Sequence, residues 1–152
     1  MNLKHLGFGL LFFLTAGIVF SYFGSRPVSP QDIGLEVSRN LEKEIKKVDS
    51  EASYILANLR ESQYTLPFLK DYSFFLYGAD RLVAWSSNDF VPTAASVAES
   101  FSVKMLKAGN GNYLAKKWKI NNTHFLVAII PLIRNYTITN DYLQTEWNDR
   151  IF

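Results

Sequence analysis

The chain has 152 residues, 48% of them hydrophobic and 20% charged, with a formal net charge of +2 at pH 7. A charge this small does not indicate a nucleic-acid partner. The absence of cysteine excludes disulfides, zinc–cysteine sites and thiol nucleophiles, and two histidines are too few for a multi-histidine metal site. We therefore expect neither a metal site nor a cofactor.

The first feature along the chain is an uncharged and almost wholly apolar stretch over residues 6–23. In a helix, it covers about 27 Å, which with its flanks just reaches across a hydrocarbon core of about 30 Å. Lys4 precedes the stretch and Arg26 follows it. The positive-inside tendency places the amino terminus in the cytoplasm and the bulk of the chain outside.

A cleaved signal peptide is the alternative interpretation of this stretch. Tyr22 and Phe23 crowd the candidate cleavage point, and aromatic residues at that depth are better explained as interfacial anchors. We expect a cytoplasmic tip at 1–5 and a transmembrane anchor at 6–24, with the lipid bilayer as a partner.

A long helix is predicted next, because Ser29 can cap a helix and Pro30 suits the first helical position. Apolar residues then recur from Leu41 to Leu59 at alternating spacings of four and three, which is a heptad seam. We expect a stalk helix over 29–62. Its seam packs on the chain's own domain or contacts a second copy, and the two uses are compatible. The residues of the expected homodimer seam are Leu41, Ile45, Val48 and Ala52.

Strand patterns dominate the remaining domain, 63–152. Residues 72–88 predict a strand, a turn and a second strand, because β-branched and aromatic residues fill both arms. Residues 113–120 and 123–133 predict another hairpin. The second of its strands is nearly continuously hydrophobic, which is typical of a central strand covered on both faces.

Between the two hairpins a helix is predicted. Val97, Phe101, Met105 and Leu106 recur at helical spacing, and glycine at 109 and 111 then ends the element. The order of long helix, hairpin, helix, hairpin predicts an α+β fold, an antiparallel sheet with flanking helices. A PAS-like sheet needs a fifth strand, which either the segment around Val91 or the polar tail after Arg134 can supply.

The sequence contains no recognisable catalytic constellation. Lys116, Lys117 and Lys119 are interpreted as a solvated strand edge. Four aromatic residues are the candidate ligand-binding set, on adjacent hairpins where they line a pocket or fill the core. They are Tyr77, Trp85, Tyr113 and Trp118.

The stretch FFLYGADRLVAWSSN, followed by NGNYLAKKWKINNTHFLVAIIPLIRNYTITNDYLQTEWN, resembles the amino-terminal extracytoplasmic region of bacterial sensor histidine kinases, especially those of Bacteroidetes. The shared elements are Trp85-Ser86, Gly111 with Tyr113, and the run from Ile133 to Leu143. The resemblance implies a PAS/Cache-like sensor domain at the bacterial inner membrane, largely periplasmic. The kinase residues of that family have no counterpart here, so a truncated receptor without a catalytic domain is expected.

Two functions remain open at this point. The first is a signal-sensing module of a two-component system, which passes a small-molecule or envelope signal through the long helix to the membrane as a homodimer. The alternative is a membrane-anchored envelope assembly or protein-interaction domain with no sensing role. An enzyme is a distant third.

Overall fold

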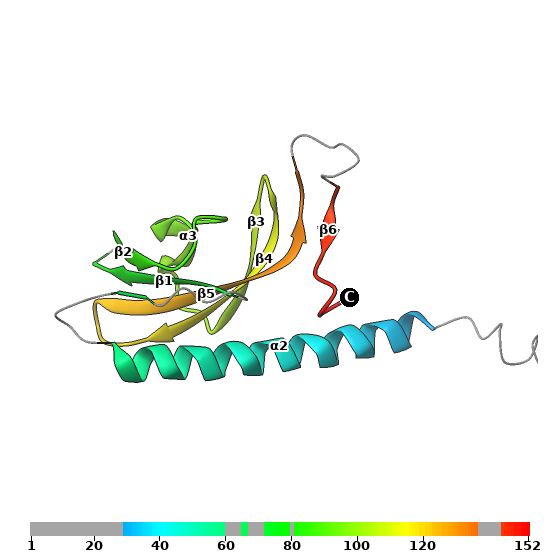
Figure 1. Ribbon diagram of the computed structural model, residues 1–152, viewed down its shortest axis with the longest axis horizontal. Helices are drawn as coiled ribbons and strands as arrows, with labels where there is room; N and C mark the ends of the chain where they lie inside the picture. The colour runs from blue at the N-terminus through cyan, green and yellow to red at the C-terminus, as the bar shows by residue number, and fades with distance from the viewer. Residues whose placement is uncertain (1–28, 60–64, 67–71, 80, 137–143) are drawn as a thin grey trace, which may run out of the picture. The chain divides into compact units, whose positions relative to one another are not determined.

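A computed structural model of the protein describes residues 29–59, 65–66, 72–79, 81–136 and 144–152. The fold is α+β, with one long helix followed by an antiparallel sheet of six strands (Figure 1). The elements are α2 (Pro30–Asn58), β1 (Ser73–Gly78), β2 (Arg81–Trp85), α3 (Ala94–Ala98), β3 (Val103–Ala108), β4 (Gly111–Lys119), β5 (His124–Arg134) and β6 (Glu146–Trp147).

The expected tip at 1–5 and anchor at 6–24 lie outside the described residues. In the part of the chain that the structure describes, no helix is both long and apolar enough to cross a membrane.

Helix α2 starts where its capping pattern predicts. The Ser29 carbonyl oxygen accepts hydrogen bonds from the amides of Asp32 at 2.9 Å and Ile33 at 3.1 Å, and Pro30 is the first helical residue. Pro30 has no amide hydrogen, and at this position none is needed for the helical ladder. The helix ends at Asn58, and residues 60–64 lie outside the described part.

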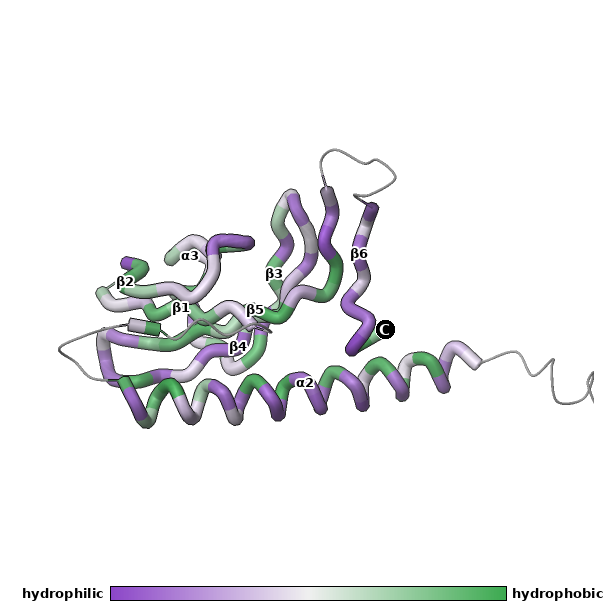
Figure 2. The backbone as a smooth tube through the Cα atoms, in the orientation of Figure 1, coloured by the Kyte–Doolittle hydropathy of each residue, from purple (hydrophilic) through white to green (hydrophobic). Residues whose placement is uncertain are grey.

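The heptad seam of α2 packs on the protein's own sheet. Val48 and Ala52 are 0% exposed and belong to the same hydrophobic cluster as side chains from β1, β4 and β5. Leu41 and Ile45 are partly buried against that cluster. From Val37 onward, α2 and the sheet form one compact unit. All four residues of the expected homodimer seam are thus engaged within a single copy (Figure 2 shows the hydropathy along α2).

The strand order is β2-β1-β5-β4-β3, with β6 paired to β5. Strand β5 is central, and its side chains alternate between two cores. Leu126 and Ala128 join the cluster under α2, whereas Val127 and Ile129 join a second cluster on the opposite face. The prediction of a central strand covered on both faces is confirmed, and so are both predicted hairpins.

The predicted helix between the hairpins is largely wrong. Only Ala94–Ala98 is helical, capped by the Thr93 side chain, and Val103–Ala108 forms edge strand β3. Leu106 is buried while its neighbour Met105 is 56% exposed, which is strand alternation. Val97, Phe101 and Met105 are four residues apart, but an irregular break separates α3 from β3, so no helix face joins them. Ala108 pairs with Gly111, so the glycines close a hairpin instead of ending a helix.

Strand β6 lies in the polar tail after Arg134, one of the two segments that the sequence left open for an additional strand. Trp147 pairs with Ile133 and Glu146 with Arg134, while residues 137–143 of the resembling motif lie outside the described part. The pairing of β4 with β5 shifts register between Asn112 and Tyr113. This irregularity lies beside Pro131, which has no amide hydrogen for a regular ladder.

Candidate functional site

Two of the four candidate aromatic residues share one face of the sheet. Tyr77 is fully buried and its hydroxyl donates a hydrogen bond to the Pro92 carbonyl oxygen; burial raises the pKa of Tyr77 to about 12. Tyr113 is 4% exposed and stacks on Phe90, with 4.1 Å between ring centroids. Both tyrosines fill the second core and line neither of the cavities described below.

The two tryptophans lie elsewhere. Trp118 packs against the cluster under α2, on the other face, with its ring centroid 6.5 Å from that of Phe74. Trp85 is 50% exposed at the end of edge strand β2. The structure therefore divides the four residues among two cores and an edge, and they do not meet around a common pocket.

A cavity instead lies beyond the second core, where β4 ends and β5 begins. We call it the β4–β5 cavity; its volume is about 550 Å³. This lies within the range of roughly 300–1,000 Å³ that is usual for small-molecule sites. Its lining is Ala79, Ala98, Ser100, Phe101, Ser102, Lys117, Lys119, Asn121, Asn122, Thr123, His124 and Phe125.

Lys117 holds one wall of this cavity in place. Its ammonium group donates to the carbonyl oxygens at the end of α3: those of Val97 at 2.7 Å, Ala98 at 3.3 Å and Glu99 at 3.0 Å. It also lies 3.8 Å from the centroid of the Phe125 ring. Removal from water lowers the pKa of Lys117. The cation thus caps the carboxyl end of a short helix and fixes that helix to β4.

Lys116, the neighbour of Lys117, projects to the other face. Its ammonium group bonds a carboxylate oxygen of Asp49 on α2 at 2.7 Å. The expectation of a solvated strand edge is therefore wrong for this pair, because β4 lies between β3 and β5 and both ammonium groups are engaged. Two successive residues of β4 therefore bond α2 on one face of the sheet and α3 on the other.

The turn between β4 and β5 positions His124. The side-chain oxygen of Asn121 accepts hydrogen bonds from the amides of Thr123 at 2.9 Å and His124 at 2.7 Å. The imidazole Nδ1 lies 2.9 Å from the Thr123 hydroxyl. A Cβ on Gly78 would lie 2.5 Å from Nε2, so the ring rests directly on a residue that has no side chain. These contacts fix the ring at the cavity wall.

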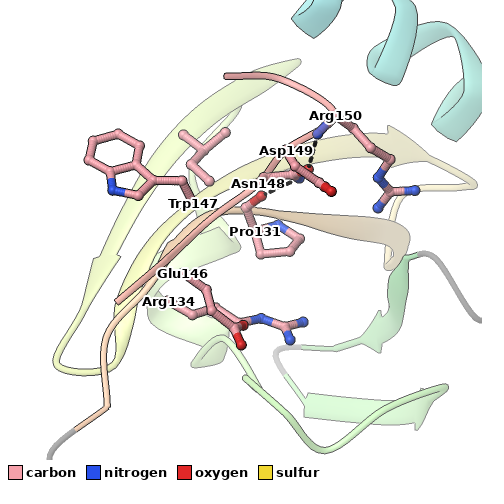
Figure 3. Close-up of a pocket in the computed structure, with 8 residues that line it drawn as sticks. Pro131, Arg134, Glu146, Trp147, Asn148, Asp149 and Arg150 are labelled. Atoms are coloured by element: carbon pink, nitrogen blue, oxygen red, sulfur yellow. Dashed lines mark hydrogen bonds between the residues drawn. The ribbon is translucent and has the colours of Figure 1, made fainter. Parts of the chain in front are cut away.

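A second, smaller cavity of about 190 Å³ lies between β5 and the carboxyl-terminal residues (Figure 3). The Asn148 side chain donates to the Pro131 carbonyl oxygen at 2.7 Å. Arg134 and Glu146 lie side by side, and Trp147 points away from them. The cavity carries charges of both signs, from Arg134, Arg150, Glu146 and Asp149. Its size and mixed charge make it the weaker candidate for a ligand.

A buried carboxylate connects the carboxyl-terminal residues to α2. Glu44 is 2% exposed; it accepts hydrogen bonds from the Tyr72 hydroxyl at 2.6 Å and the Lys47 ammonium at 2.5 Å. The Arg150 Nε lies 3.5 Å from the same carboxylate. Burial by itself raises the pKa of Glu44, but the hydrogen bonds from Lys47 and Tyr72 and the charges of Arg150 and Lys47 outweigh it and hold the pKa below its ordinary value.

Sequence reasoning did not find the residues that organise these sites. Glu44 is one of several charged residues between seam positions, and only packing against Tyr72 and Arg150 distinguishes it. Lys117 is distinguished from Lys116 only by the face to which it points. Among the described residues, no three His, Cys, Asp or Glu side chains come close enough together to hold a metal ion.

Comparisons of the chain with known protein families, with curated proteins and with solved structures found no match.

We predict that Glu44→Gln reduces the dependence of stability on acid pH. The folded state lowers the pKa of Glu44, so its carboxylate stabilises the fold above its ordinary pKa, and this contribution is lost as the pH falls through the folded-state value. At pH 7 the variant is expected to lose about 1–3 kcal/mol of unfolding free energy.

Thermal unfolding of the full chain between pH 7 and pH 3 measures this difference. Glu42→Gln, at an exposed position on the same helix, is the matched control and should retain the wild-type slope. Parallel slopes for wild type and Glu44→Gln would contradict the assignment.

Proposed function

We propose that this chain is a membrane-anchored, extracytoplasmic signal-sensing module of a two-component sensor histidine kinase, with a PAS/Cache-like sheet. The α+β architecture supports the proposal, since a long helix precedes an antiparallel sheet. Strand β3 supplies the fifth strand that such a sheet needs. The resemblance in sequence and the apolar stretch at 6–23 support the receptor type and the anchor.

One observation carries the proposal: β4 links the cavity side of the sheet to the stalk helix. Lys117 borders the β4–β5 cavity and bonds α3, while the next residue back, Lys116, bonds Asp49 on α2. A ligand that moves α3 or the start of β5 also acts on β4, and β4 is bonded to α2 through Lys116 and Asp49. A sensor needs two arrangements with different affinities for the stimulus, and this linkage provides a route between them.

The carboxyl-terminal residues contact the same helix. Arg150 lies beside Glu44, and the Asn40 side chain donates to the Ile151 carbonyl oxygen at 3.4 Å. Ile151 is 1% exposed within the cluster under α2. A displacement of α2 would therefore also shift the last described segment of the chain.

We also propose that the stalk helix forms a homodimer, with a contact that differs from the seam. The seam side chains are occupied by the sheet. Leu35 is 65% exposed in the first turns of α2, and an exposed apolar side chain there is suited to contact with a second copy.

The alternative function, an envelope assembly or protein-interaction domain, is favoured by one feature. Edge strand β3 exposes Val103 and Met105, which are 41% and 56% accessible. An exposed apolar edge is a surface to which a partner strand can add.

For the sensing function, we predict that filling the cavity changes α2. Ser102→Trp places a large ring at the cavity wall. It is expected to alter amide hydrogen exchange in residues 41–52 of α2 by about threefold or more, because β4 is bonded directly to α2 through Lys116 and Asp49. Exchange is measured by mass spectrometry on the full chain in detergent micelles.

Lys107→Trp, on the exposed side of β3, is the control and should leave α2 unchanged. A folded Ser102→Trp variant with wild-type exchange in α2 would refute the coupling and favour the alternative function.

For the anchor, single cysteines can be placed cleanly because the chain contains none. In spheroplasts, we expect a membrane-impermeant maleimide to label Ser38→Cys, which is exposed on α2. Asn2→Cys should react only after permeabilisation, since it lies in the expected cytoplasmic tip. The reverse pattern, or recovery of the protein without membranes, contradicts the proposed topology.

For the homodimer, we expect Leu35→Asp to weaken self-association of the full chain about tenfold without changing its melting temperature, because this side chain is exposed. Ile45→Asp should instead lower the unfolding free energy by roughly 2–3 kcal/mol, since it places a charge against the core. Sedimentation in micelles measures the self-association of each variant, and thermal unfolding measures its stability. If Ile45→Asp dissociates the protein while its stability is unchanged, the seam itself is the interface.

A further inference from the structure

The charged side chains that line the β4–β5 cavity in the described part of the chain are both lysines. Lys117 and Lys119 are among the twelve residues that line it, and among the described lining residues there is no Asp or Glu. Glu99, adjacent to the cavity in sequence, forms an ion pair with Lys104 at 2.6 Å, which offsets its charge. The described lining therefore contributes positive charge, and a concave site focuses the field of such charges on a ligand.

The two lysines have different roles. The ammonium hydrogens of Lys117 are directed to three carbonyl oxygens, so this residue contributes charge and holds the wall, but does not offer donors to a ligand. Lys119 is exposed at the end of β4, and among the described residues no carboxylate pairs with it. Lys119 is thus the cation that can donate directly to a ligand.

Neutral donors line the same cavity as Lys119. Ser100 and Ser102 supply hydroxyl groups, and Asn122 supplies a side-chain amide at the turn, whereas the Thr123 hydroxyl already donates to the Asn121 side-chain oxygen at 3.1 Å. The neighbouring Asn121 is committed to the turn through its side-chain oxygen. Hydroxyl and amide donors next to an ammonium group form a suitable environment for carboxylate or phosphate oxygens.

The remaining wall is apolar. Phe101, Ala98 and Ala79 line it. The Phe125 ring centroid lies 5.2 Å from that of Tyr77 and 3.8 Å from the Lys117 ammonium, which is also 5.3 Å from the Phe101 centroid, so protein groups already contact part of both rings. The apolar contact area is therefore small, and it suits a ligand that carries a modest hydrophobic group next to its charge.

We infer that the β4–β5 cavity binds a small organic anion whose carboxylate or phosphate group is held by Lys119 and the adjacent hydroxyl and amide groups, and whose apolar part contacts Phe101. This inference deepens the proposed sensing function and rests on it for its biological role. The binding itself depends only on the cavity.

The test is calorimetric titration of the full chain in neutral detergent micelles with four probes: phenylacetate, succinate, inorganic phosphate and the uncharged phenylacetamide. Phenylacetate is expected to bind at least about tenfold more tightly than its amide, because a hydrogen bond to a charged group contributes roughly this factor. Its affinity should fall as salt is added. Equal affinity for phenylacetate and its amide, or no binding of any of the three anions, overturns the inference.

Variants locate the site. Lys119→Gln should weaken phenylacetate binding about tenfold, Lys119→Arg should retain most of it, and Asn122→Asp should weaken it by adding a negative charge to the wall. Lys107→Gln, an exposed lysine outside the cavity, is the matched control and should bind as wild type. Loss of binding in Lys107→Gln to the same degree as in Lys119→Gln would show non-specific attraction and overturn the assignment.

Hydrogen exchange of α2 in the same samples shows whether the anion-binding inference or the proposed sensing function fails. Anion binding at Lys119 without any change in α2 supports the site and argues against sensing. A change in α2 induced by Ser102→Trp, together with no anion binding, supports sensing and overturns the ligand class.

Discussion

Strand β5 must be covered on both faces, and the rest of the structure depends on that requirement. Leu126, Ala128 and Ile130 are buried on one face, and Val127 and Ile129 on the other. At roughly 2 kcal/mol for each buried aliphatic side chain, neither face of this strand can be left in water. Helix α2 covers the first face; α3 and the aromatic residues around Tyr77 cover the second. Because β5 is buried on both faces, the buried side chains of the adjacent strands belong to one of two cores, one on each face of the sheet.

The contact between α2 and the sheet contains a charge as well as a hydrophobic seam. A carboxylate as buried as that of Glu44 is costly unless it is paired, and here Tyr72, Lys47 and Arg150 satisfy it. These partners come from three separate parts of the chain. Sliding α2 by one turn would carry Lys47 along with the carboxylate but would separate the carboxylate from Tyr72 and Arg150, so the network favours a single register. Apolar contacts along a heptad seam discriminate much less between registers.

The second face of the sheet differs from the first, because a cavity lies at its end. Side chains fill its centre, and the space for a ligand lies at the end, where β4 and β5 meet. Lys116 and Lys117 illustrate why this position matters, because consecutive strand residues point to opposite faces. One reaches the stalk helix and the other reaches α3. A single strand therefore lies between the cavity and the helix, which is the physical basis of the sensing function proposed above.

The sequence by itself determined the elements whose periodicity is strong: the long helix from its cap and seam, and the hairpins around β1–β2 and β4–β5 from alternating residues and turns. It did not separate α3 from β3, because the spacing of Val97, Phe101 and Met105 also arises across a helix, a break and a strand. It grouped Tyr77, Trp85, Tyr113 and Trp118, yet only tertiary structure decided which face each one occupies. A side chain's face depends on strand register, and register shifts at Leu76/Tyr77 and Asn112/Tyr113 reset it. Two partners of Glu44, Tyr72 and Arg150, are likewise long-range, and so are the carbonyl groups that Lys117 contacts, since no local sequence pattern relates these residues.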